Sequence, residues 1–212
     1  MTTTTPANPS RGMIPGWAMA LIVILVLALG IGGCAVSVKN NGVTKDETAE
    51  KKWADVQSAY QRRADLIPNL VEVVKGYSDY EQETLTKVVE ARAKATSITI
   101  DPSNITPEQL KQFQAAQDEL GSAISRLLVT VERYPDLKAN QNYLDLQSQL
   151  EGTENRINTS RNDYNEAVRD YNTFIRKFPN SLFASYYGFE KKGLFQAQAG
   201  SENAPKVDFS DK

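Results

Sequence analysis

The sequence predicts an all-α protein in which an N-terminal transmembrane helix is followed by an antiparallel, up-and-down four-helix bundle with long helices. The stretch 17–38 is apolar and contains no charged side chain. Across 44–178, apolar side chains recur at steps of three and four residues, the period of one helix face. No segment of the body has the pattern of a β-strand, so the sequence predicts helices throughout.

The stretch 17–38 has the length of a membrane span. At about 1.5 Å per residue, a helix of this length covers a hydrocarbon core about 30 Å thick. The preceding residues 1–16 are rich in Thr and Pro, which predicts a disordered tail. Arg11 flanks one side of the span, whereas Lys39 and three further lysines up to residue 52 flank the other. The positive-inside rule therefore favours a cytoplasmic body.

A second interpretation of the apolar stretch is a lipoprotein signal that ends at Cys34. The residues Ile31-Gly32-Gly33-Cys34 approximate a lipobox, in which small residues precede a cysteine that receives the lipid. A tail with Arg11 as its only basic residue is a poor match to the start of a signal peptide. Lipidation of Cys34 would place the body in the periplasm. Both interpretations attach the body to a membrane.

The first half of the body is predicted to contain two helices that meet at a proline. Asn40-Asn41-Gly42 is a turn signal that should end the span, and Thr44-Lys45-Asp46-Glu47 fits a capping box that starts the next helix. Pro68 disfavours helical geometry at the residue before it. We therefore expect the first body helix to end near Ala64 and the second to run from Pro68 to about Ala95.

The second half of the body is predicted to contain two longer helices. Thr106-Pro107-Glu108-Gln109 combines an N-cap, a proline at the first helical position and a capping-box glutamine. The helix that starts there should stop before Pro135. The last helix should run from about Asp136 to Lys177, with a nearly 3.5-residue repeat typical of coiled coils. In this register Glu154 and Arg161 occupy buried positions.

Composition excludes several classes of function. The body carries 23 of the 24 basic residues beside all 26 acidic ones, so it has no broad positive field for nucleic acid. The chain has no histidine, the commonest general base and metal ligand, and its single cysteine lies in the apolar stretch. We therefore expect no catalytic residues, no cofactor, no metal site and no enzyme activity.

Two clusters of charged and polar side chains are candidates for structural or docking roles. One lies beside Pro68 and the other lies in the middle of the last helix. Charged pairs between them could fix the alignment of the helices, and the alternative is a docking site for another protein. The candidate residues are Arg62, Arg63 and Asp65 in the first cluster, and Glu154, Asn155, Arg156 and Arg161 in the second.

The end of the chain, 179–212, is predicted to be an aromatic strap followed by a polar tail. Phe178-Pro179-Asn180 should end the last helix. The aromatic residues after it either pack over one end of the bundle or form a patch for a membrane interface or a partner. The candidate patch residues are Phe183, Tyr186, Tyr187, Phe189 and Phe195.

The motifs assembled above resemble the LemA family of bacterial membrane-anchored helical proteins. The resemblance covers nearly the whole chain after residue 16. It rests on the segments Gln61–Val71 (QRRADLIPNLV), Glu90-Ala91-Arg92, Glu132–Asn140 (ERYPDLKAN), Gly152–Ile157 (GTENRI) and Tyr171-Asn172, and on the aromatic strap. The resemblance implies an N-terminal membrane segment at the bacterial inner membrane, a four-helix body in the cytoplasm, and no agreed biochemical activity.

These observations lead to a primary hypothesis and two alternatives. The primary hypothesis is a non-enzymatic, membrane-anchored helical scaffold or adaptor of the bacterial envelope, with other envelope proteins or copies of itself as partners. The first alternative is a lipid-binding protein that remodels the bilayer. The second is a lipid-anchored envelope lipoprotein.

Overall fold

A computed structural model describes residues 15–76 and 82–196, and over these residues it contains helices and no strand. The tails 1–14 and 197–212 lie outside the described residues, and so do most of the predicted disordered tail and the predicted polar tail. The elements are α1 (Gly16–Lys75), α2 (Gln82–Ser97), a 3-10 turn η1 (Pro102–Asn104), α3 (Pro107–Val131), α4 (Pro135–Lys138), α5 (Gln141–Arg176) and α6 (Asn180–Ala184).

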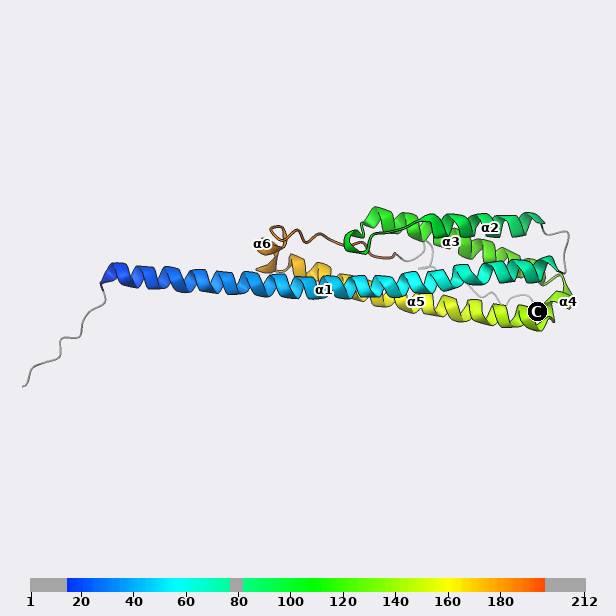
Figure 1. The fold of residues 1–212 in the computed structure, drawn as a ribbon, viewed down its shortest axis with the longest axis horizontal. Helices are drawn as coiled ribbons and strands as arrows, with labels where there is room; N and C mark the ends of the chain where they lie inside the picture. The colour runs from blue at the N-terminus through cyan, green and yellow to red at the C-terminus, as the bar shows by residue number, and fades with distance from the viewer. Residues whose placement is uncertain (1–14, 77–81, 197–212) are drawn as a thin grey trace, which may run out of the picture.

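Helix α1 is a single helix of 60 residues that joins the apolar stretch to the body without a break (Figure 1). The predicted turn at 40–42 and the predicted new helix start at Thr44 are therefore wrong. The polar side chains in this region bond within the helix instead, each to the carbonyl oxygen four residues earlier: Asn41 to Ser37 at 2.9 Å, Thr44 to Asn40 at 2.9 Å and Thr48 to Thr44 at 2.7 Å. Because these groups are satisfied locally, the helix continues.

The predicted helix break at Pro68 is also wrong, because Pro68 lies inside α1. Proline lacks the N–H that would bond to the carbonyl oxygen of Ala64, four residues earlier. Arg92 of α2 replaces that donor, and its Nε lies 2.8 Å from the Ala64 oxygen. The bond from a neighbouring helix thus satisfies the acceptor, and α1 continues to Lys75. The second helix, α2, begins only at Gln82.

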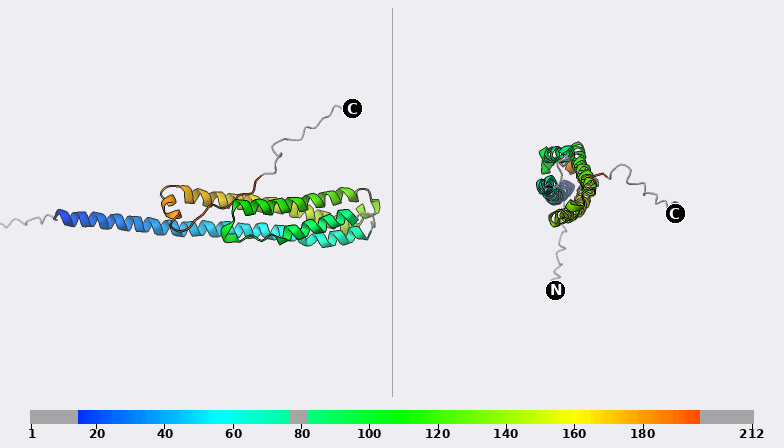
Figure 2. Two further views of the ribbon diagram at one scale, coloured as in Figure 1. Left: turned by 90° about the horizontal axis from the view of Figure 1, so that it is seen from above. Right: turned by 90° about the vertical axis from the view of Figure 1, so that its right-hand side faces the viewer.

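The body half of α1 and the helices α2, α3 and α5 run alongside one another (Figures 1 and 2). The body half of α1 packs along α5, α2 packs along α3, and α1 also contacts α2. At the end of the body far from the apolar stretch, one core cluster combines side chains of α1, α2, α3, α4 and α5. A second cluster surrounds the fully buried Trp53 nearer the apolar stretch.

The helix start at Thr106 is confirmed. Its hydroxyl accepts a bond from the Gln109 N–H, and the Gln109 side-chain oxygen accepts a bond from the Thr106 N–H. The predicted single helix from residue 136 to residue 177 is divided in two. The four-residue α4 ends at Lys138, and Asn140 caps α5 by accepting a bond from the Tyr143 N–H at 3.2 Å.

Helix α5 keeps the predicted 3.5-residue repeat, but its polar positions are shifted by one residue. Thr153 and Ser160 are buried where the prediction had Glu154 and Arg161. The side chain of Glu154 is 52% exposed. Small hydroxyl side chains fit a close seam between helices without burying a charge, so the expectation of a buried Glu154 is wrong. The buried positions are Tyr143, Leu146, Leu150, Thr153, Ile157, Ser160, Tyr164, Val168, Tyr171 and Ile175.

Candidate functional site

The strap, defined here as residues 179–196, lies at the end of the body where the apolar part of α1 emerges (Figure 1). Its first part is the short helix α6, which contacts both α1 and α5. Its second part is an extended segment that returns along α5 toward η1 and α3, where the Gly193 N–H donates to the Ile105 oxygen at 2.9 Å. The strap therefore connects the membrane-proximal end of the body to its middle.

Two asparagines on α5 hold the extended part of the strap. The side-chain amide of Asn172 donates to the Lys192 oxygen at 3.0 Å and accepts from the Lys192 N–H at 3.1 Å. Asn165 does the same with Phe195, at 3.1 and 2.9 Å. Each side-chain amide thus bonds to both the N–H and the C=O of one strap residue, as the backbone of an adjacent β-strand does. The sequence reasoning missed these residues, and their seven-residue spacing on one helix face is the signal that could have found them.

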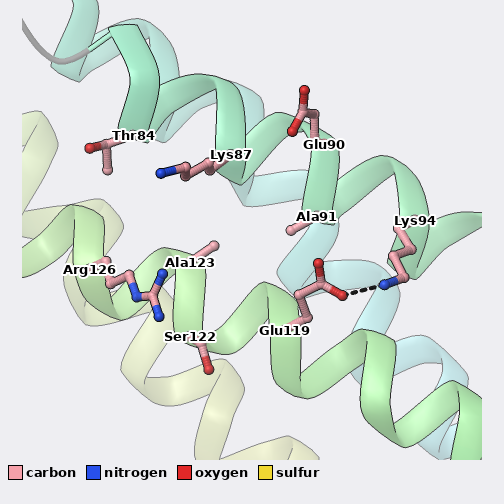
Figure 3. Close-up of a pocket in the computed structure, with 9 residues that line it drawn as sticks. All are labelled: Thr84, Lys87, Glu90, Ala91, Lys94, Glu119, Ser122, Ala123 and Arg126. Atoms are coloured by element: carbon pink, nitrogen blue, oxygen red, sulfur yellow. Dashed lines mark hydrogen bonds and ion pairs between the residues drawn. The ribbon is translucent and has the colours of Figure 1, made fainter.

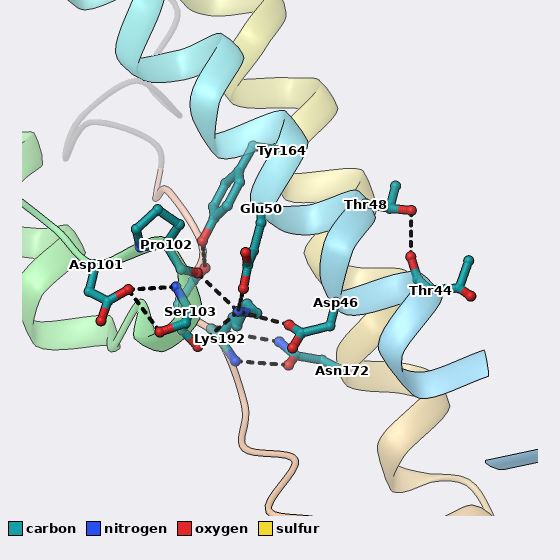
Figure 4. A network of polar contacts seen from close by, with 11 residues as sticks. Thr44, Asp46, Thr48, Glu50, Asp101, Pro102, Ser103, Tyr164, Asn172 and Lys192 are labelled. Atoms are coloured by element: carbon teal, nitrogen blue, oxygen red, sulfur yellow. Dashed lines mark hydrogen bonds and ion pairs between the residues drawn. The ribbon is translucent and has the colours of Figure 1, made fainter. Parts of the chain in front are cut away.

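Lys192 is the centre of a polar network inside the body (Figure 4). Its side chain is 4% exposed, and its ammonium lies 2.8 Å from Asp46 Oδ1 and 3.8 Å from Glu50 Oε1. The contact with Asp46 Oδ1 is an ion pair and not a well-aligned hydrogen bond. The ammonium also donates to the carbonyl oxygens of Pro102 and Ser103 at 3.1 and 3.2 Å. A single buried cation thus joins the strap, α1 and the η1 loop.

The five aromatic residues predicted as an interface patch are placed in different environments. Phe195 is buried against Trp53 and Tyr164, with ring centroids 6.1 and 5.6 Å away. Phe189 is partly buried and occupies the space that a side chain at Gly42 would fill.

The other three patch residues lie nearer the apolar stretch. Tyr187 is half-buried and donates a bond to the Ala35 oxygen at 3.2 Å. Phe183 is half-buried, and Tyr186 is 84% exposed. Phe178 and Leu182, which the sequence reasoning did not select, are also exposed, at 81% and 66%. The most exposed large hydrophobic side chains at this end of the body are therefore Phe178, which directly precedes the strap, and Leu182 and Tyr186 within it.

The two predicted polar clusters meet through a single pair. Arg63 is 5% exposed, and its Nη1 lies 3.2 Å from Glu154 Oε2. Its Nη2 donates to the backbone and side-chain oxygens of Gln117 at 2.9 and 2.8 Å, and its Nε is buried without a hydrogen bond. Gln117 in turn donates to the Ala95 oxygen at 3.2 Å. Arg63 thus connects α1 to both α3 and α5.

The other members of those clusters do not join the Arg63 site. Arg62, Asn155 and Arg156 are exposed, and Asp65 is exposed and accepts a bond from Gln61 of the same helix. Arg161 lies over the ring of Phe195, with 4.8 Å from its guanidinium carbon to the ring centroid, and it donates to the backbone oxygen of Gln196. Arg161 therefore holds the end of the strap.

The pockets of the described body include two grooves between neighbouring helices. The first, of about 600 Å³, lies between α2 and α3, and Lys87, Lys94, Glu119 and Arg126 are drawn around it in Figure 3. Its charges have both signs, and the Lys94 ammonium pairs with the Glu119 carboxylate. The second, of about 720 Å³, lies between α3 and α5 with Arg63 and Glu154 in its wall. Within the described residues, no group of three or more His, Cys, Asp or Glu side chains could hold a metal ion.

Several ionisable side chains of the body have shifted pKa values, and the causes are burial and hydrogen bonding. Burial raises the pKa of Tyr60, Tyr164 and Tyr171, so these phenols stay protonated at neutral pH. A hydrogen bond to Asp163, 2.7 Å away on α5, raises the pKa of Lys52 on α1. These shifts accompany contacts between helices and the strap.

Over residues 15–76 and 82–196, the fold and site define a class: an all-helical protein with one helix long and apolar enough to cross a bilayer. No residue of the most apolar window of α1 is buried. A model of the LemA family matches residues 52–209, and the chain belongs to this family.

The relatives in the family have two kinds of name. Protein LemA of Metamycoplasma hominis is 26% identical over 177 residues, which cover 83% of this chain and 77% of the relative. Magnetosome protein MamQ 2 of Paramagnetospirillum magneticum is 27% identical over 216 residues, covering 93% and 78%. Magnetosome protein MamQ of Magnetospirillum gryphiswaldense is 25% identical over 210 residues, covering 91% and 77%.

Proposed function

We propose that the protein is a non-enzymatic, single-pass scaffold or adaptor of the bacterial inner membrane, with a body built as an antiparallel four-helix bundle. The observation that carries the proposal is the continuity of α1, which has no hinge between the apolar stretch and the body. The part of α1 after residue 38 extends about 55 Å at 1.5 Å per residue. The body is thereby rigidly connected to the membrane helix, and each of its lateral surfaces is available to partners at a fixed distance from the bilayer.

The contacts of the body support a role in binding partners rather than in catalysis. Its two most buried cations, Arg63 and Lys192, each connect three parts of the structure and are engaged by carboxylates and carbonyl oxygens. Relatives named as magnetosome proteins support a role at a larger cellular assembly. The partner we propose is another membrane or envelope protein, or a second copy of the chain, bound along the groove between α3 and α5.

Site-specific photo-cross-linking in cells tests this proposal. A photo-reactive residue at Ser125, in the wall of the α3–α5 groove, should give a discrete adduct with a partner or a ladder of self-adducts. The same residue at Lys51, exposed on α1 outside that groove, is the matched control. A flexible Gly-Ser insertion after Asn40 should weaken the Ser125 adduct, because it uncouples the height of the body from the membrane. Absence of any adduct at Ser125, with a monomer in detergent, contradicts the scaffold.

The charges beside the apolar stretch support a cytoplasmic side for the body. Lys39 and Lys45 follow the apolar stretch in α1, and Arg176 and Lys177 end α5, whose Asp170 pairs with Lys45 at 3.9 Å. We propose from this a cytoplasmic body. Intact-mass analysis of the mature chain tests it against the lipoprotein alternative. A mass lacking residues 1–33, with acyl chains on Cys34, would place the body in the periplasm.

Direct membrane remodelling is the second candidate function, and the exposed Phe178, Leu182 and Tyr186 favour it. Reconstitution of the full chain into vesicles at rising protein-to-lipid ratio separates the two functions. Remodelling predicts tubules or a fall in vesicle diameter by electron microscopy, whereas a scaffold leaves vesicle shape unchanged.

A further inference from the structure

The exposed aromatic end of the strap is held at a defined height on α1. The Tyr187 hydroxyl donates to the Ala35 oxygen at 3.2 Å, and the Lys39 ammonium lies 5.8 Å from the centroid of the Tyr187 ring. The ring of Phe189 fills the space beside Gly42, where an added Cβ would lie 2.5 Å from it. Because α1 is continuous, these contacts fix the strap relative to the apolar stretch as well as to the body.

That height coincides with the second boundary of the bilayer. Trp17 begins the apolar stretch and is 70% exposed. Ala35 follows it by 18 residues, which corresponds to about 27 Å of helix rise, against a hydrocarbon thickness of about 30 Å. When Trp17 lies at one interface, Ala35 and the Tyr187 bound to it lie at the other. Tryptophan and tyrosine are the residues enriched at both interfaces of membrane proteins.

Three large apolar or aromatic side chains face outward at this height. Phe178, Leu182 and Tyr186 are 81%, 66% and 84% exposed and come from the end of α5, from α6 and from the chain just after it. These three large exposed side chains lie within nine residues of one another, and α6 between them packs against α1 and α5.

Basic residues lie closest to the apolar stretch at this end of the body. The segments 32–45 and 171–189 contain the basic residues Lys39, Lys45, Arg176 and Lys177 and no acidic residue, although the whole chain has a net charge of −2. Basic side chains next to a membrane helix are attracted to anionic lipid headgroups. Acidic residues begin directly beyond these segments, and Asp170 pairs with Lys45 at 3.9 Å. Contact with an anionic surface therefore falls to the exposed Lys39, Arg176 and Lys177.

We propose that residues 178–187, together with Lys39, Arg176 and Lys177, form an interfacial foot that lies in the headgroup region of the bilayer that α1 crosses. Phe178, Leu182 and Tyr186 enter the boundary between headgroups and acyl chains, and the three cations contact anionic headgroups. By binding the bilayer surface next to α1, the foot restricts the tilt of the body relative to the membrane. The inference rests on the membrane anchorage of the proposed function, and its test reports that anchorage separately.

Fluorescence quenching in vesicles tests the foot with the full chain. In a Cys34→Ala background, single cysteines at Leu182, Val26 and Val129 carry an environment-sensitive fluorophore, and the vesicles contain phosphatidylglycerol and lipids with a quencher near the headgroup or in the acyl chain. Val26 reports the span, and Val129, exposed to 68% near the far end of α3, is the control for an exposed apolar side chain. The foot predicts strong quenching of the Leu182 label by headgroup-level quencher, with a blue-shifted emission, and none at Val129.

The other quenching patterns distinguish failure of the foot from failure of the membrane anchorage. Quenching of Val26 without quenching of Leu182 overturns the foot and leaves the anchorage standing. Absence of quenching at Val26 overturns the anchorage itself. A Leu182 label that is shielded from both lipid quencher and aqueous iodide means that protein, such as a second copy of the chain, covers the patch, and this also overturns the foot.

A charge variant tests the headgroup contact independently of the apolar one. Replacing Arg176 and Lys177 by glutamine should reduce the Leu182 quenching severalfold in phosphatidylglycerol vesicles at low salt, because the cations no longer hold the foot to the surface. Replacing two exposed cations at the far end, Arg133 and Lys138, should leave it unchanged. Equal quenching in the parent and the Arg176 and Lys177 variant would overturn the assignment of those cations to the foot.

Discussion

The hydrogen bond from Arg92 to α1 is the contact that allows Pro68 to lie within a helix, and its removal gives the sharpest test of the fold. Replacing Arg92 by methionine keeps a long side chain but leaves the Ala64 oxygen without a donor. Ala64 is 3% exposed, so water cannot readily replace the lost bond. A buried acceptor without a partner costs about 1–3 kcal/mol, and we expect Arg92→Met to lower the free energy of unfolding by about 2 kcal/mol.

A double-mutant cycle separates this bond from other contacts of Arg92. Pro68→Ala restores the backbone N–H that normally bonds to the Ala64 oxygen, so the arginine donor becomes redundant. In the Pro68→Ala background, Arg92→Met should cost only about 0.5 kcal/mol, which corresponds to a coupling of about 1.5 kcal/mol between the two sites.

The free energies come from urea denaturation of the full chain in detergent micelles, followed by circular dichroism at 222 nm. Arg156→Met removes an arginine from the exposed face of α5 and is the matched control, with an expected change within about 0.5 kcal/mol. An equal loss for Arg92→Met with and without Pro68 would refute the reasoning, because the bond to Ala64 would then not be what Arg92 contributes.

Three further predictions concern the strap. Lys192→Met leaves two carboxylates and two carbonyl oxygens without their buried cation, so it should cost about 3 kcal/mol, or roughly 6–12 °C in Tm, whereas Lys191→Met at an exposed site should change little. In Gly193→Ala, the new Cβ would lie 2.9 Å from the Pro107 backbone, which should lower the free energy of unfolding by about 1–3 kcal/mol, while Gly152→Ala, with no atom within 4 Å, should raise it by up to about 1 kcal/mol. Burial raises the pKa of Tyr164, so its contribution to stability is complete below the ordinary pKa of 10.0 and is lost as the pH rises above it. Thermal melts should therefore show Tm falling above pH 10, and falling less steeply in Tyr164→Phe; parallel slopes would contradict this assignment.

The sequence predicted the features that depend on residues close together in the chain. The apolar stretch, the capping box at Thr106 and the seven-residue repeat of α5 are local patterns, and the structure contains all three. Long motifs in order along the chain also indicated the LemA family, which the family match shows. In each case the physical cause lies within one helix or one helix end.

The candidate site was predictable only in part. Arg63 and Glu154 were selected from sequence, and the structure pairs them. Lys192 was not selected, because nothing around it in the chain distinguishes it from the exposed Lys191. Its burial depends on Asp46 and the η1 loop, which are distant in sequence and meet it only in the folded body.

The sequence by itself determined that this chain is helical, that one stretch suits a bilayer, and that its last segment differs in character from the rest. The tertiary structure decided where the helices end and which positions are buried. Pro68 carries a local signal to break a helix, yet α1 passes through it, because Arg92 from α2 supplies the missing donor. A local sequence signal determines the conformation that a segment prefers in isolation. Contacts with residues distant in the chain change the relative free energies of the alternative conformations.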